Sequence, residues 1–204
     1  DVFDTADVDK IDTDKYKLIL FLDAFCLTDR EKAVIEKDLK KGGKTILWCY
    51  APGYIDKQTQ SASYISGFTG IDVLPYEGND TKAVAFGEKY GFDTRYDTMF
   101  YAKSGEVLGV YEHDGFAALA RKDCGGFVSI SSALGNLPGA VLRQIAKDAG
   151  VFLYNEEDNP VYANSLCVGV CAQRDGEVTL RLPKATKVKE AFSETIYSVK
   201  DGKL

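Results

Sequence analysis

The chain has 204 residues, a pI near 4.9 and a formal net charge of −6. Hydrophobic residues make up 45% and charged residues 27% of it, a balance that excludes a disordered, collagen-like or coiled-coil chain. The acidic charge and the lack of a basic stripe argue against a nucleic-acid partner. No apolar run is long enough for a membrane-spanning helix, so no membrane partner is expected.

The first predicted elements form a strand–helix–strand unit. Residues 16–22 (YKLILFL) are a continuous apolar run, typical of a strand that is buried on both faces. Thr28 and Glu31 have the spacing of a capping box, which predicts the start of a helix. Residues 45–50 (TILWCY) predict a second buried strand, parallel to the first with a right-handed crossover. The longest basic cluster complements the dipole at the end of this helix; it comprises Lys37, Lys40, Lys41 and Lys44.

The middle of the chain predicts short strands and two further helices. A helix is expected over 57–70, and a second helix begins at Pro138 and ends at Gly150. Residues 88–104 are polar and aromatic without a clear period and are expected to be irregular. The short strands are expected over 71–74, 82–86, 107–111, 117–121, 127–131 and 151–154, with a hairpin between 107–111 and 117–121.

The last part of the chain differs from the rest. Apolar runs separated by turn signals predict only strands there, over 161–163, 166–172, 178–182, 188–192 and 195–199. We therefore expect an α/β domain over residues 1–160 and a C-terminal β extension over residues 161–204.

Five cysteines are present, an odd number without CxxC or zinc-ligand spacing. A disulfide scaffold and a metal site are therefore not expected. Cys26, Cys49, Cys167 and Cys171 lie in apolar stretches and are predicted to be small core residues. These cysteines leave the compartment open, because a bacterial periplasmic protein can also carry free buried thiols.

The stretch 16–55 (YKLILFLDAFCLTDREKAVIEKDLKKGGKTILWCYAPGYI) resembles the β-galactosidase trimerisation domain of family 42-type glycoside hydrolases. Residues 63–73, 137–164 and 176–192 fit the same family in the same order. The resemblance implies a class I glutamine-amidotransferase-like, flavodoxin-like fold, with three layers and a mainly parallel sheet. In that family another strand and helix precede the segment matching Asp1, and a further strand follows Leu204. Both ends are therefore expected to be cut, and the first strand of the domain to be missing.

The resemblance also implies a non-catalytic role. The catalytic carboxylates of the family lie on a separate TIM barrel, N-terminal to this domain, and no part of residues 1–204 resembles that barrel. The implied function is an accessory domain of a bacterial glycoside hydrolase that self-associates, as a trimer in the family, and supports the catalytic barrel. No catalytic residue, metal or cofactor is expected on this chain, and its compartment is either the cytoplasm or the periplasm.

A thiol hydrolase of the amidotransferase type is one alternative. Cys49 would be its nucleophile and His113, the one histidine of the chain, its base. However, Cys49 lies between Trp48 and Tyr50, and a strained nucleophile elbow has little room for such large neighbours. The family position of the nucleophile corresponds to Tyr50.

A carbohydrate-binding module is the other alternative. The loop over residues 51–54 (APGY) follows the second predicted strand and lacks the Ser/Thr-rich phosphate cradle of a flavin mononucleotide site. Its aromatic neighbours suit either a protein interface or a sugar platform. Quenching of Trp48 by galactosides is the expected sign of sugar binding. The candidate interface or ligand residues are Trp48, Tyr50, Pro52, Gly53 and Tyr54.

Overall fold

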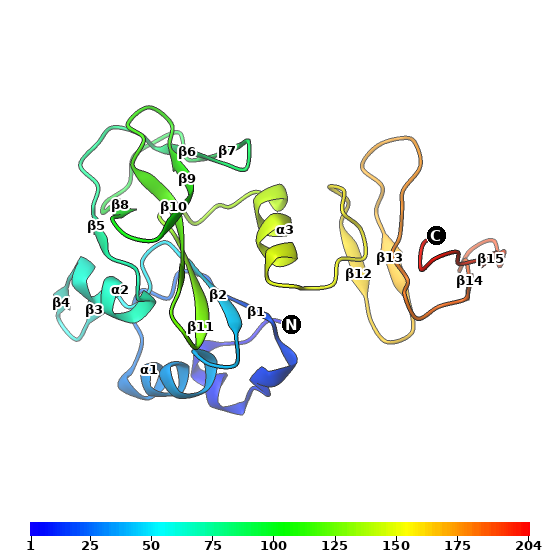
Figure 1. Ribbon diagram of the computed structural model, residues 1–204, viewed down its shortest axis with the longest axis horizontal. Coiled ribbons are helices and arrows are strands. Elements are labelled where there is room, and N and C mark those ends of the chain that lie inside the picture. The colour runs from blue at the N-terminus through cyan, green and yellow to red at the C-terminus, as the bar shows by residue number, and fades with distance from the viewer. The chain divides into compact units, whose positions relative to one another are not determined.

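The computed structural model describes residues 1–204, which divide into an N-terminal unit, Asp1–Gly150, and a C-terminal unit, Val151–Leu204 (Figure 1). The predicted division between residues 160 and 161 stays a prediction. No helix in the structure has the length and apolar character needed to cross a membrane.

The predicted strand–helix–strand unit is confirmed. Thr28 caps the helix: its hydroxyl accepts a hydrogen bond from the Glu31 amide, and its own amide donates to the Glu31 carboxylate over 2.7 Å. The two strands are parallel, with Leu18 opposite Thr45. Two short 3-10 helices precede the unit, and its helix ends in a π-helical turn. The elements are η1 (Thr5–Lys10), η2 (Thr13–Lys15), β1 (Leu18–Phe21), α1 (Asp29–Val34), η3 (Ile35–Leu39) and β2 (Lys44–Cys49).

A nine-stranded sheet forms the centre of the N-terminal unit. Its main order is β1-β2-β11-β10-β9-β6-β7, with β8 beside β10 and β5 beside β8. Only β1, β2 and β11 are parallel neighbours, and the other pairs are antiparallel. The remaining elements of this unit are β3 (Ile55–Asp56), β4 (Thr59–Gln60), α2 (Ala62–Thr69), β5 (Val73–Pro75), β6 (Lys82–Ala85), β7 (Glu88–Gly91), β8 (Phe100–Ala102), β9 (Glu106–Tyr111), β10 (Ala117–Asp123), β11 (Phe127–Ser132) and α3 (Gly139–Asp148).

The prediction of a three-layer, mainly parallel flavodoxin-like fold is wrong. The sheet curls into a mixed half-barrel, and with 19% of residues in helices there are too few to cover both of its faces. Parallel strands need a crossover connection, usually a helix, whereas antiparallel strands can be joined by a tight turn. Between α2 and α3 the chain has strands but no helix, and these strands pair antiparallel with one another; only β11 also has a parallel neighbour, β2.

Three local predictions also need correction. The segment 88–104, expected to be irregular, contains two strands: β7 forms a hairpin with the preceding β6, and β8 pairs with β5 and β10. Residues 57–60 belong to the small β3–β4 hairpin, so the helix begins later, at Ala62. In the C-terminal unit, no strand forms over residues 151–154 or 178–182.

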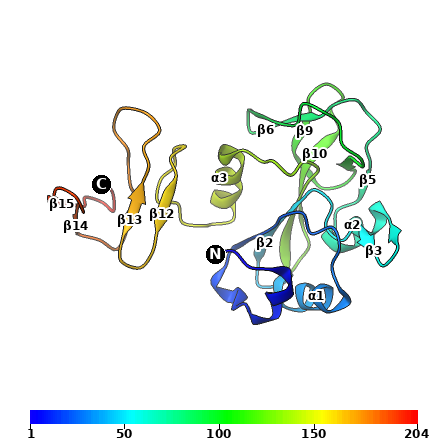
Figure 2. The same ribbon diagram turned by 180° about the vertical axis from the view of Figure 1, so that it is seen from behind.

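Both faces of β2 are buried. Ile46 and Trp48 point into one core cluster with Ile35, Leu39 and Phe68. Leu47 and Cys49 point into another cluster, which includes Val141 and Ile145 of α3. Alternate residues of a strand face opposite sides of the sheet, so β2 joins the two clusters through its side chains. In both views β2 lies between α1 and α3 (Figure 2).

The C-terminal unit contains two separate two-stranded antiparallel sheets, β12 (Val161–Ala163) with β13 (Val168–Val170) and β14 (Lys187–Lys189) with β15 (Ile196–Ser198). Large apolar side chains stand exposed in it: Tyr162 is 73%, Leu166 93% and Phe192 97% exposed. Isolated two-stranded ribbons are marginally stable in water. This unit therefore has little core of its own.

Candidate functional site

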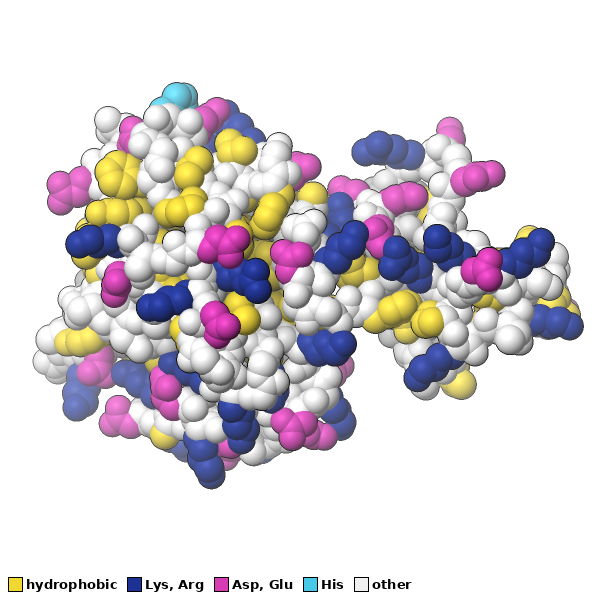
Figure 3. Space-filling view, viewed as in Figure 1, with side chains coloured by type: hydrophobic (Ala, Val, Ile, Leu, Met, Phe, Trp, Pro, Cys, Tyr) yellow, Lys and Arg dark blue, Asp and Glu magenta, His cyan; other side chains and the backbone are white.

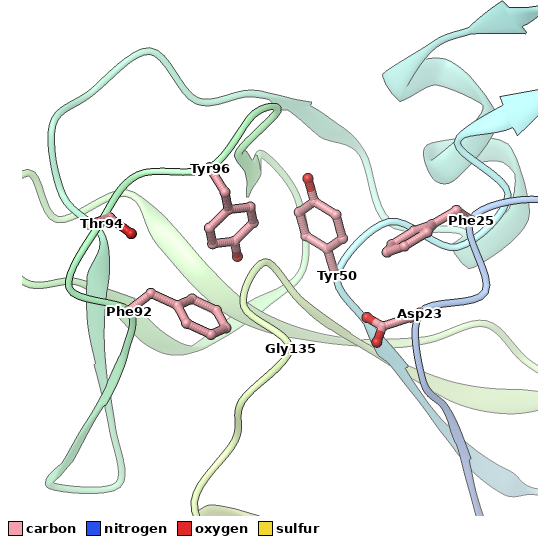
Figure 4. Close-up of a pocket in the computed structure, with 7 residues that line it drawn as sticks. All are labelled: Asp23, Phe25, Tyr50, Phe92, Thr94, Tyr96 and Gly135. Atoms are coloured by element: carbon pink, nitrogen blue, oxygen red, sulfur yellow. The ribbon is translucent and has the colours of Figure 1, made fainter.

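A pocket lies where the three parallel strands end. Asp23 follows β1, Tyr50 follows β2, and Gly135 follows β11. Parallel neighbours bring their carboxyl ends to one edge of a sheet, which is the usual place for ligands in open α/β sheets. The pocket has a volume of about 400 Å³, within the range of small-molecule sites. Its seven lining residues are Asp23, Phe25, Tyr50, Phe92, Thr94, Tyr96 and Gly135 (Figure 4).

Tyr50 forms the middle of the pocket wall and is held from several sides. Its backbone has a φ of 66°, the left-handed conformation at a sharp strand exit. Its amide donates to the Ser132 carbonyl over 2.8 Å, and its hydroxyl donates to the Thr98 carbonyl over 2.5 Å. The ring packs edge-on against Phe25 and Tyr96, each with a centroid distance of 5.3 Å. The Tyr50 ring is therefore a fixed surface.

A second wall comes from the segment between β7 and β8. Phe92 is tied to Thr81 by two hydrogen bonds: its amide donates over 3.0 Å, and its carbonyl accepts over 2.7 Å. The Phe92 ring meets Tyr96 edge-on at 5.1 Å. Phe92 and Asp23 lie on opposite sides of the space above Gly135 (Figure 4). The pocket therefore has aromatic walls and one carboxylate at its rim.

The electrostatics of the site keep its tyrosines protonated. Burial raises the pKa of Tyr50, and the neighbouring Tyr54, Asp97 and Asp23 raise it further against the hydrogen bond to Thr98. Burial, then Tyr50 and Asp23, also raises the pKa of Tyr96. Both hydroxyls are therefore neutral hydrogen-bond donors and acceptors at neutral pH.

The five residues singled out from the sequence divide between the pocket and the core, and only Tyr50 lines the pocket. Trp48 is fully buried, stacks on Phe21 at 4.8 Å and donates to the Ser129 hydroxyl over 2.9 Å. Pro52 and Gly53 are buried in the loop after β2, and Tyr54 is half-buried against Phe100. Trp48 belongs to the core cluster of α1 and η3, so its fluorescence is a poor reporter of ligands in the pocket.

Sequence reasoning missed the other six pocket residues. Asp23 and Phe25 follow the first predicted strand directly, so the end of that strand was a usable signal. Phe92, Thr94 and Tyr96 carry no such signal, because long-range strand pairing brings them to the site.

The structure shows no hydrogen bond between Cys49 and His113. Cys49 is buried, and this burial, with the charge of Asp23, raises the pKa of its thiol to about 12. A thiol with such a pKa carries almost no thiolate at neutral pH. The His113 side chain is 75% exposed and pairs with Asp80 instead. The geometry does not support a thiol nucleophile.

Alkylation will separate the cysteines by burial. The prediction that four of them are core residues is wrong for three, because Cys26, Cys167 and Cys171 are exposed. We expect iodoacetamide at pH 8 to modify these three in the native chain, and Cys49 only after unfolding. Peptide mass spectrometry along a time course measures this order. Rapid labelling of Cys49 in the native chain would contradict it.

His113, in the turn between β9 and β10, forms a titratable pair with Asp80, which lies just before β6. Nδ1 of His113 lies 2.6 Å from Oδ1 of Asp80, and the amides of His113 and Asp114 donate to Oδ2 over 2.7 and 2.9 Å. The Asp80 hydrogen bond and charge raise the pKa of His113. Burial alone would raise the pKa of Asp80, but the two amides and the imidazolium outweigh it and lower that pKa.

This pair predicts a pH dependence of defined sign. The pKa of His113 is higher in the folded chain, so its contribution to stability is complete below the unfolded value, about 6.5, and is lost as pH rises through the folded value. The contribution of Asp80 is lost as pH falls below its unfolded value. We expect an NMR titration of the single histidine to give a midpoint above 6.5, and Asp80→Asn to lower it. Asp93→Asn, which removes an exposed carboxylate paired with Lys82, should leave it unchanged. A midpoint at or below 6.5 in the unmodified chain would contradict the pairing.

The structure has no group of three or more His, Cys, Asp or Glu side chains that could hold a metal ion.

Positive and negative side chains are interspersed on the visible face of the N-terminal unit (Figure 3). Hydrophobic side chains gather on the same face over β5, β8, β9 and β10.

Comparison with known proteins shows that a similar fold occurs as one part of larger enzymes. No family model and no curated protein matches the sequence. A polyextremophilic β-galactosidase from the Antarctic haloarchaeon Halorubrum lacusprofundi matches with a TM-score of 0.62 and 14% identity, over 92% of this chain and 31% of that chain. A β-galactosidase from the psychrophilic Marinomonas ef1 matches with a TM-score of 0.51 and 11% identity, over 86% of this chain and 26% of that chain.

These matches support the predicted relation to β-galactosidases at the level of the fold. The present chain spans less than a third of the length of either β-galactosidase. The narrower assignment to the trimerisation-domain class does not follow from identities of 14% and 11%.

Proposed function

We propose that this chain is a non-catalytic accessory domain of a glycoside hydrolase, which self-associates and supports a catalytic barrel located elsewhere. The observation that carries the proposal is the fold match, which covers nearly the whole of this chain but only a minor part of each β-galactosidase. The buried Cys49 thiol and the pairing of His113 with Asp80 argue against the alternative of a thiol hydrolase.

The edges of the main sheet support contact with further protein. At one end of the sheet, β7 carries the charged residues Glu88 and Lys89, which protect an edge against pairing. At the other end, β1 has the sequence LILF without a charge and pairs only with β2. Leu20 is 40% and Leu22 68% exposed at this edge. An open apolar edge strand can pair with a strand of another chain, and a second copy of this chain is the partner proposed here.

Sedimentation velocity of the purified chain tests self-association. We expect a dimer or larger species at micromolar concentration, and a monomer for Leu22→Lys. Val107→Lys is the matched control, because Val107 is a 55% exposed apolar residue on β9, an inner strand paired on both sides. A monomer at every concentration, or equal effects of the two variants, would contradict self-association through this edge.

A further inference from the structure

The pocket beside Tyr50 has the features of a small-molecule site, and the proposed accessory function gives it no ligand. Four of its seven lining residues are aromatic: Phe25, Tyr50, Phe92 and Tyr96. Their edge-on contacts, at 5.1–5.3 Å, hold the rings against one another. The walls are therefore preformed, which lowers the entropic cost of binding.

The polar groups of the pocket are free to meet a ligand. The carboxylate of Asp23 and the hydroxyl of Thr94 are exposed and make no hydrogen bond or ion pair within the chain. Asp23 has a φ of 51°, and its carbonyl accepts from the Phe25 amide over 2.8 Å. This tight turn presents the carboxylate to the space in front of Tyr50 (Figure 4).

We propose that this pocket binds one ring of a neutral hexopyranoside. The apolar C–H face of a sugar ring packs on aromatic side chains, and its hydroxyls donate to a carboxylate in charge-assisted hydrogen bonds. Aromatic walls with one acceptor and one hydroxyl at the rim meet both requirements. The volume of about 400 Å³ lies near the lower limit for small-molecule sites and suits a single ring better than a long chain.

An organic cation is the competing ligand, because ammonium groups also bind to aromatic faces. Such binding is strong only where water is excluded, whereas Asp23 and Phe92 are exposed to solvent. An exposed ion pair contributes little, and a quaternary ammonium has no N–H to donate to Asp23, whereas the hydroxyls of a sugar can donate to it. The sugar assignment rests on the proposed function, since a domain of a glycoside hydrolase works among sugars.

Ligand-observed NMR on the 204-residue chain tests the proposal with methyl β-D-galactopyranoside and methyl β-D-glucopyranoside as probes, and with tetramethylammonium as the competing cation. We expect saturation transfer to the ring protons of at least one glycoside and none to tetramethylammonium. Phe92→Ala removes one wall, and Asp23→Asn removes the charge while keeping a residue type that tolerates a positive φ. Each variant should weaken binding about five- to tenfold.

Phe116→Ala is the matched control. Phe116 is 44% exposed and packs edge-on against tyrosines, as Phe92 does, but it lies outside the pocket. Loss of binding in the two pocket variants, with Phe116→Ala unchanged, supports the site. The proposal is overturned by no sugar binding, by binding of tetramethylammonium instead, or by equal affinities in all variants. None of these outcomes alters the sedimentation result, so failure of the sugar site can be distinguished from failure of the proposed accessory role.

Discussion

Trp48→Ala is expected to reduce the free energy of unfolding by about 3–5 kcal/mol, the usual loss for a large aromatic residue removed from a core. Trp48 is fully buried between Phe21, on which it stacks at 4.8 Å, and Phe68, which it meets edge-on at 5.0 Å. Its indole N–H also donates to the Ser129 hydroxyl, which is itself fully buried. Alanine therefore leaves both a cavity and a buried hydroxyl without its donor.

Urea denaturation followed by far-UV circular dichroism measures this loss without needing the tryptophan signal. Trp48→Phe keeps most of the ring volume and should cost less than Trp48→Ala. Tyr54→Ala is the control in the loop that follows β2, because Tyr54 is only half-buried. If Trp48→Ala cost less than about 1 kcal/mol, within the range of ordinary substitutions, Trp48 would not lie in the core.

The second large effect is expected at Lys40, whose side chain is only 8% exposed. Its ammonium group hydrogen-bonds to the Phe68 carbonyl and to Glu36. It also lies 4.4 Å from the centroid of the Phe68 ring and 5.7 Å from that of Phe127. Removing a buried cation with such partners should cost about 2–4 kcal/mol, combining the lost charged hydrogen bonds with the cation–π contacts. The sequence pattern identified Lys40 only as part of a basic cluster at the end of a helix.

The adjacent lysine provides the control. Lys41 is 53% exposed and pairs with Asp38 at 3.0 Å, so Lys41→Ala should change stability by no more than about 0.5 kcal/mol. Lys40→Met keeps the apolar stem and should recover part of the loss. Urea unfolding of the three variants measures the difference, and equal effects of Lys40→Ala and Lys41→Ala would contradict the buried cation.

Local signals predicted the first strand–helix–strand unit well because its determinants are close together in the sequence. The capping box of Thr28 and Glu31 and the two apolar runs around it act within a few residues. The antiparallel hairpin of β9 and β10 also follows from local turn residues. These elements do not determine which strands lie beside them in the sheet.

The overall fold was predicted wrongly. The resemblance implied a mainly parallel sheet, but the chain lacks the crossover helices that such a sheet needs. Strand β8 lies in a segment without periodicity and pairs with the distant β10 and β5, whereas β7 forms a hairpin with the neighbouring β6. The same long-range pairing places Phe92 and Tyr96 opposite Asp23. Of the pocket, the sequence could therefore indicate only the residues that directly follow a predicted strand.

The size of the native polypeptide tests whether this chain is a domain of a larger glycoside hydrolase, as proposed above. An antibody raised against the 204-residue chain can be used to blot an extract of the source cells. We expect a band far above 22.4 kDa, large enough to include a catalytic barrel. A single band near 22.4 kDa would contradict it.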